Sequence, residues 1–192
     1  MGIKNLIKNQ KIEIDAHHRG DGTANSWDSP NEVHLEKKCK SNKDSYNIKI
    51  PLNSNNPVTI NRKDNQTVPS SIKKEVENAL KDPQTRQEFV NNVLNAIEAY
   101  SSNLPDDVKA RQAIGYIRKA FNLGIPRCCF RRNIKNFYAC LFYYNKTWVY
   151  VIIQKKRIII AANEKPWKRF TQSENKFNYI FDPNVTEILY KE

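Results

Sequence analysis

The sequence predicts an α+β protein in which central helices pack on a C-terminal antiparallel β-meander, with a short β segment at the N-terminus. Three observations support this fold class. Apolar residues recur every three to four positions between residues 69 and 124. Aromatic and β-branched runs separated by short polar turns follow residue 136. Short stretches before residue 61 alternate between apolar and polar residues, as half-buried strands do.

The N-terminal segment predicts four short strands separated by polar loops. These are KIEID (11–15), VHLEKKC (33–39), YNIKIPL (46–52) and VTI (58–60). In the third strand, Ile48 and Ile50 are expected to face inward. Alternation divides the second strand into two sides, with Val33, Leu35 and Lys37 on one and His34, Glu36 and Lys38 on the other.

The middle of the chain predicts three helices. The first begins at Pro69 and runs to about Lys81. Asp82-Pro83 starts the second, because Asp caps free backbone amides and Pro is tolerated at the first helical position. The third begins at 105–107, and Gly124 is expected to form its C-cap.

The last third predicts mainly strands, with Cys140 as a small buried hydrophobic residue. The expected strands are 137–144, 148–154, 157–162, 177–181 and 185–190. The chain is therefore expected to divide into an N-terminal β/loop segment (1–68) and a helical hairpin with a basic antiparallel sheet (69–192), or to form one compact domain from both.

The positive charge is concentrated near the C-terminus. Residues 125–192 hold 13 basic and 5 acidic side chains and so supply +8 of the net charge of +12. A basic surface attracts polyanions, so nucleic acid is the expected partner, with an acidic protein as the alternative. No apolar run approaches the roughly 20 residues that span a bilayer, and no signal peptide is recognisable. A cytoplasmic protein with no membrane partner is therefore expected.

Possible metal ligands gather in residues 12–42, which contain all three histidines, Cys39 and six carboxylates. Asp15-Ala16-His17-His18 ends a predicted strand, a loop with two glycines follows, and Asn31 and Asn42 come later. This pattern resembles the HNH family of metal-dependent nucleases. The resemblance implies His18 as general base, Asn31 as the loop-positioning residue, and a divalent cation, Mg²⁺ or Mn²⁺, held by Asp15, His17 and Asn42.

A second interpretation uses other residues of the same stretch. Asp28, Glu36 and Lys38 are similar to the core of PD-(D/E)xK nucleases, in which two carboxylates bind Mg²⁺ and a lysine helps to activate water. Asp15 is an alternative to Asp28 as the first acid. Strand alternation places Glu36 and Lys38 on one face, as this chemistry requires. In a third interpretation, 12–42 is simply a polar loop.

Basic residues interleaved with aromatic residues form a candidate nucleic-acid interface. Arginine contacts phosphate in bidentate fashion, and exposed aromatic rings stack on bases. Trp167 is the expected stacking residue. The expected contacts are Arg127, Arg131, Arg132, Lys155, Lys156, Arg157, Trp167, Lys168 and Arg169.

Together these features predict a small divalent-metal-dependent endonuclease, of the kind found in restriction, phage defence and toxin systems. Two rivals remain. The first is a basic module that binds nucleic acid or an acidic partner without catalysis. The second resembles small metal-independent ribonuclease toxins, because it places a helix (106–123) on an antiparallel sheet that carries Arg and Lys.

Overall fold

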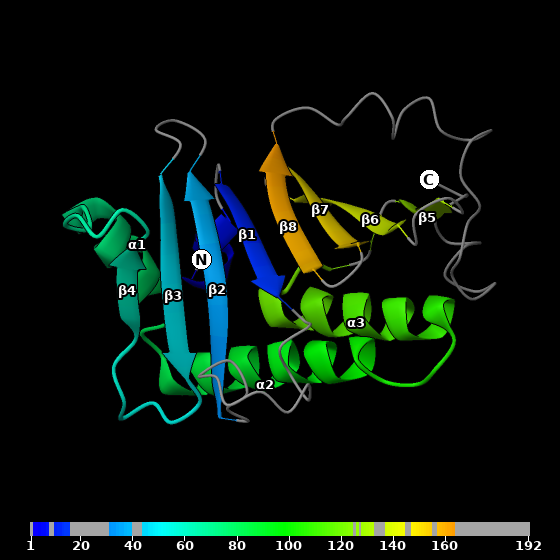
Figure 1. Cartoon of the computed structure of the whole chain (residues 1–192), viewed down its shortest axis with the longest axis horizontal. Helices are drawn as coiled ribbons and strands as arrows, with labels where there is room; N and C mark the ends of the chain where they lie inside the picture. The colour runs from blue at the N-terminus through cyan, green and yellow to red at the C-terminus, as the bar shows by residue number, and fades with distance from the viewer. Residues whose placement is uncertain are drawn as a thin grey trace.

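One antiparallel sheet organises the molecule. The computed structural model describes residues 2–7, 10–15, 31–39, 44–124, 126, 128–132, 137–144, 147–154 and 157–163. Within these residues, eight strands pair in the order β4-β3-β2-β1-β8-β7-β6-β5 (Figure 1). Their bounds are β1 (Gln10–Asp15), β2 (Glu32–Cys39), β3 (Ser45–Pro51), β4 (Thr59–Arg62), β5 (Cys128–Arg132), β6 (Phe137–Tyr144), β7 (Thr147–Gln154) and β8 (Arg157–Asn163). Helices and this sheet together confirm the α+β class.

The helices cover one face of the sheet. They are the 3₁₀ helix η1 (Gly2–Ile7) and the α-helices α1 (Ser70–Ala79), α2 (Pro83–Tyr100) and α3 (Asp106–Phe121). Helices α2 and α3 run side by side along this face (Figure 1); α2 contacts β2, while α3 contacts β6 and β7. The helix η1, which was not expected from the sequence, contacts α1, β1 and β8.

The predicted helix starts are confirmed, but one predicted end is wrong. The Asp82 carboxylate accepts hydrogen bonds from the backbone N–H and the hydroxyl of Thr85, both at 2.8 Å, and Pro83 occupies the first turn of α2. At the end of α3 the left-handed C-cap is Asn122, with φ 54°, and not Gly124. Asparagine tolerates this conformation better than most residues, and Gly124 takes a positive φ of its own two residues later.

The core lies between the sheet and the helices. Burial alternates along the whole of β2. Val33, Leu35 and Lys37 share one side of the strand, as predicted, and the structure shows that this side is the buried one. Phe89 of α2 and Phe121 of α3 meet edge to face, with ring centroids 5.1 Å apart. Cys140 is fully buried, as expected.

The N-terminal and C-terminal strands belong to one sheet. Strand β1 lies between β2 and β8, with Ile12 opposite Ile160. The predicted meander is present as β6–β8, and β5, which was not predicted as a strand, extends it at the edge. The strands expected at 177–181 and 185–190 lie outside the described residues.

Candidate charged site on the outer face of the sheet

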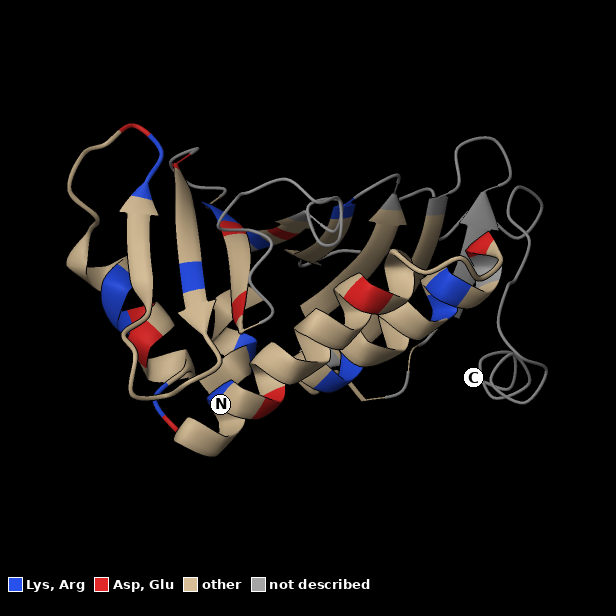
Figure 2. Cartoon of the chain, turned by 60° about the horizontal axis from the view of Figure 1, so that its bottom comes forward, with Lys and Arg blue, Asp and Glu red and all other residues tan. Residues whose placement is uncertain are grey.

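The sheet has a second face, opposite α2 and α3, which we call the outer face. Residues of β1 and β2 that alternate with the core residues lie on it. Charge is unevenly distributed over the strands. Strands β6 and β7 contain no charged residue, whereas basic and acidic residues lie next to one another on β1–β3 (Figure 2). Among the described side chains of the outer face, the charged ones therefore gather on β1–β3 and on the neighbouring strand β8.

Glu13 of β1 is the centre of this charged region. Its side chain is only 7% exposed. Lys11 approaches its Oε1 at 2.9 Å, and Lys38 approaches its Oε2 at 3.1 Å. Arg157 of β8 lies 3.7 Å from Oε2. Cations from three adjacent strands thus surround one carboxylate.

Two opposing effects act on the pKa of Glu13. Burial alone would raise it, because it disfavours the charged form. Hydrogen bonds and charge from Lys11 and Lys38 oppose this effect and together lower the pKa below its ordinary value. Glu13 is therefore an ionised carboxylate at neutral pH, held in a nearly dry position by positive charge.

A second carboxylate lies directly across the strand pair. Glu36 of β2 is the register partner of Glu13. It pairs with Lys63 at 2.8 Å and lies 3.9 Å from Lys38, whose ammonium group therefore stands between the two carboxylates. These six residues, which we call the Glu13 cluster, carry four positive and two negative charges: Lys11, Glu13, Glu36, Lys38, Lys63 and Arg157.

His34 continues this face along β2. Its Nε2 lies 3.1 Å from Oε1 of Glu32, and Lys49 of β3 lies 3.4 Å from the other Glu32 oxygen. His34 is two residues from Glu36 on the same strand face, or about 7 Å along the strand. An imidazole therefore lies on the same surface as the Glu13 cluster.

The predicted catalytic residues are only partly described. Glu36 and Lys38 share one face of β2, as expected, and the carboxylate that they meet is Glu13. Asn31 is an exposed turn residue whose carbonyl accepts a hydrogen bond from the backbone N–H of Leu52 at 2.6 Å. Asp15 is the last residue of β1, without a described side chain. The remaining predicted residues His17, His18, Asp28 and Asn42 lie outside the described residues.

Sequence reasoning missed Glu13, although one signal was available. Alternation in KIEID places Lys11 and Glu13 on the same side of the strand, away from Ile12 and Ile14. The missing information was the pairing partner of the strand, since only the sheet order brings Lys38 and Arg157 to this side chain.

Most of the predicted basic interface is not described. Arg157 is 54% exposed and belongs to the Glu13 cluster. Arg131 and Arg132 lie in β5, at the far edge of the sheet, without described side chains. The other predicted contacts lie outside the described residues: Arg127, Lys155, Lys156, Trp167, Lys168 and Arg169.

An aromatic pair lies on the β6–β7 half of the outer face. Tyr143 and Trp148 are register partners, with ring centroids 4.6 Å apart. Tyr143 is 40% exposed, and among the described residues only Leu104 is a large hydrophobic side chain with a similar exposure. Beside them, Leu141 and Tyr150 belong to a second, smaller apolar cluster. Aromatic surface and charged surface thus occupy the same side of one sheet.

The described residues do not assemble a metal centre. No group of three His, Cys, Asp or Glu side chains among them is placed to hold a metal ion. The two carboxylates that meet, Glu13 and Glu36, already pair with cations, and the net positive charge of the cluster opposes the binding of a divalent cation. This charge balance suits an anion instead.

Comparisons with protein-family models, with curated proteins and with solved structures gave no match. Among the described residues, no helix is long and apolar enough to cross a membrane.

Proposed function

We propose that the protein is a ribonuclease that cleaves RNA at the Glu13 cluster without a metal ion. One observation carries this proposal: an ionised carboxylate, 7% exposed, meets Lys11, Lys38 and Arg157 on the outer face. Phosphoryl transfer without a metal ion requires a base that accepts a proton and cations that bind the phosphate. A carboxylate beside lysine and arginine side chains can supply both.

The proposed reaction begins when a phosphate of the RNA binds Lys38 and Arg157. These side chains exchange their contacts with Glu13 for contacts with the phosphate, which leaves the carboxylate available to take the proton of the neighbouring 2′-hydroxyl. The 2′-oxygen then attacks phosphorus, and the cations stabilise the added negative charge. The bond from phosphorus to the 5′-oxygen breaks, and a ring N–H of His34 donates its proton to the departing oxygen. The products are a 2′,3′-cyclic phosphate and a 5′-hydroxyl.

The charge of the cluster favours this reaction over the metal-dependent one. A pair of carboxylates that binds Mg²⁺ needs its negative charge for the cation. Here Lys38 contacts both Glu13 and Glu36, and Lys63 also neutralises Glu36. The proposed reaction uses the 2′-hydroxyl as the attacking group, so its substrate is RNA, because DNA lacks that group.

The test compares RNA and DNA strands of the same sequence in EDTA and in Mg²⁺. We expect RNA cleavage in EDTA with cyclic-phosphate ends, and no cleavage of DNA. The double variant His17→Ala/His18→Ala should retain this activity. Cleavage that requires Mg²⁺ and disappears in the double variant would contradict the proposal in favour of the HNH-like interpretation. Salt-sensitive binding without any cleavage would contradict it in favour of a basic binding module.

A further inference from the structure

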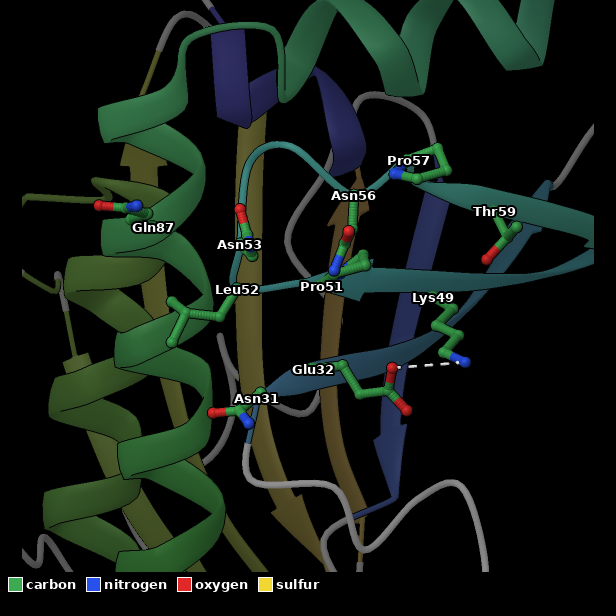
Figure 3. Close-up of a pocket in the computed structure, with 10 residues that line it drawn as sticks. All are labelled: Asn31, Glu32, Lys49, Pro51, Leu52, Asn53, Asn56, Pro57, Thr59 and Gln87. Carbon is green, nitrogen blue, oxygen red and sulfur yellow. Dashed lines mark ion pairs between the residues drawn. The ribbon is translucent and has the colours of Figure 1, made fainter.

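A pocket opens where the outer face ends beside α2. Its volume is about 760 Å³, within the range of small-molecule sites. Strand β2 contributes Glu32, β3 contributes Lys49 and β4 contributes Thr59, while the loop after β3 contributes Asn53 and Asn56 (Figure 3). The pocket thus joins three neighbouring strands to one loop.

Arg86 of α2 fixes this loop from beneath. The Arg86 side chain is buried, and its guanidinium donates to four backbone carbonyls of residues 51–56, those of Pro51, Asn53, Ser54 and Asn56, over 2.5–3.4 Å. Since these bonds use only the backbone, the side chains of Asn53 and Asn56 remain at the pocket wall. A loop held in this way presents its amide groups in fixed positions, which lowers the entropy cost of binding.

The lining selects an uncharged ligand rich in hydrogen-bonding groups. Glu32 and Lys49 lie 3.4 Å apart and neutralise each other (Figure 3). Amide groups of Asn53 and Asn56 add donors and acceptors, although Asn53 Oδ1 already accepts from the backbone of Asn55. The ring of Pro51 supplies an apolar surface. A planar ring with adjacent donors and acceptors on its edge matches this lining, and nucleobases have that structure.

The position of the pocket connects it with the Glu13 cluster. Glu32, His34 and Glu36 follow one another on the same face of β2. Glu32 is four residues from Glu36, or about 13 Å along the strand. The Glu13 cluster carries net positive charge and the pocket wall does not. One bound RNA chain can therefore place a phosphate at the Glu13 cluster and a base in the pocket.

We propose that this pocket binds a nucleobase of the RNA substrate and sets the sequence preference of cleavage. The inference rests on the proposed function, because the Glu13 cluster would contact a phosphate of the same RNA molecule whose base lies in the pocket. The pocket acts as a specificity site and takes no part in bond breaking.

The test measures binding of the four ribonucleoside 5′-monophosphates and of ribose 5-phosphate to the full chain by calorimetry at low salt. We expect at least one nucleotide to bind about tenfold or more tightly than ribose 5-phosphate. Asn56→Ala and Glu32→Gln should each reduce that preference about tenfold, since both retain the Arg86 contacts of the loop. Asn78→Ala, an exposed asparagine of α1, is the matched control and should bind as the wild type does.

Equal binding of ribose 5-phosphate and all four nucleotides would overturn the inference. So would an unchanged preference in both Asn56→Ala and Glu32→Gln, each checked for folding by its thermal transition. The proposed function can fail separately. If the wild type binds a base through the pocket but cleaves no RNA, the pocket is supported and the ribonuclease function is contradicted. If the wild type cleaves RNA but binds no nucleotide more tightly than ribose 5-phosphate, the proposed ribonuclease function stands and the nucleobase pocket is overturned.

Discussion

Lys37 and Lys38 are neighbours on β2, but they lie in opposite environments. Lys38 faces outward, is 37% exposed, and pairs with the carboxylates of Glu13 and Glu36. Lys37 is fully buried beneath the helices, and its ammonium group donates to the carbonyl of Leu6 at 2.5 Å. Burial lowers the pKa of Lys37 to about 8, although Glu75 and Cys39 oppose this shift. Lysine therefore forms surface ion pairs on one face of β2 and a buried hydrogen bond to the backbone on the other.

The two faces satisfy cations in different ways. On the outer face, lysine and arginine meet carboxylates, as in the Glu13 cluster. On the helix-covered side, buried cations meet backbone carbonyls: Lys37 holds η1 through Leu6, and Arg86 holds the loop after β3. We infer that substitutions on the outer face change activity, whereas substitutions of buried cations change stability.

The largest expected effect separates the two lysines. Lys38→Met should lower the rate of RNA cleavage about a thousandfold, because it removes a phosphate-binding cation. Lys37→Met should leave the rate within a few-fold of the wild type. Single-turnover cleavage in EDTA measures both variants. Equal losses in the two variants would indicate a shared structural cause and would show that Lys38 has no special role in cleavage.

Removal of the Arg86 clamp should have the next largest effect. Arg86→Met leaves several backbone carbonyls without their donor, and we expect a loss of about 3 kcal/mol in the free energy of unfolding. Urea denaturation measures this value, with Arg118→Met, at an exposed position of α3, as the control. A loss equal to that of the control would show that the loop does not depend on Arg86.

The buried lysine predicts a pH dependence of stability. The pKa of Lys37 falls from 10.5 to about 8 on folding, so the unfolded chain binds more protons between these values. The cost of burying the charged form is present in full at neutral pH and is relieved as the pH rises. Relative to Lys37→Met, the wild type should gain about 1 kcal/mol in the free energy of unfolding between pH 7 and pH 9. A constant difference over that range would place Lys37 in a more hydrated environment.

A peripheral pair of the cluster provides the smallest effect. Lys63 is 52% exposed and pairs with Glu36 at 2.8 Å. Exposed ion pairs contribute little, so Lys63→Ala should change the free energy of unfolding by about 0.5 kcal/mol or less. Thermal denaturation measures it, and a loss above about 2 kcal/mol would mean that the outer face also stabilises the fold.

Local patterns predicted the elements and the faces of the strands. Alternation in residues 33–39 correctly placed Lys37 and Lys38 on opposite sides of the strand, and Asp82-Pro83 correctly started α2. Periodicity is a property of one segment, which is why these predictions succeeded. Gly124 is wrong as the C-cap of α3 because Asn122, which tolerates a left-handed conformation, ends the helix two residues earlier.

Contacts between distant segments were not predictable in this way. Strand alternation does not identify the neighbouring strand, so nothing local indicated that β8 brings Arg157 to Glu13. Helical spacing in the sequence does indicate that Arg86 is buried, since it lies three residues before Phe89 on the apolar side of α2. Its carbonyl partners come from a loop some 30 residues earlier, which helical spacing does not identify.

The proposed reaction depends on the carboxylate of Glu13, and the rate of RNA cleavage by Glu13→Gln in EDTA shows whether this carboxylate is the base. Glutamine keeps the size of the side chain but cannot take the proton of the 2′-hydroxyl. We predict a rate at least about a hundredfold below that of the wild type, with RNA binding retained. Glu98→Gln, an exposed substitution on α2, should leave the rate unchanged. Cleavage by Glu13→Gln at the wild-type rate would show that Glu13 is not the base and would place the reaction elsewhere in the chain.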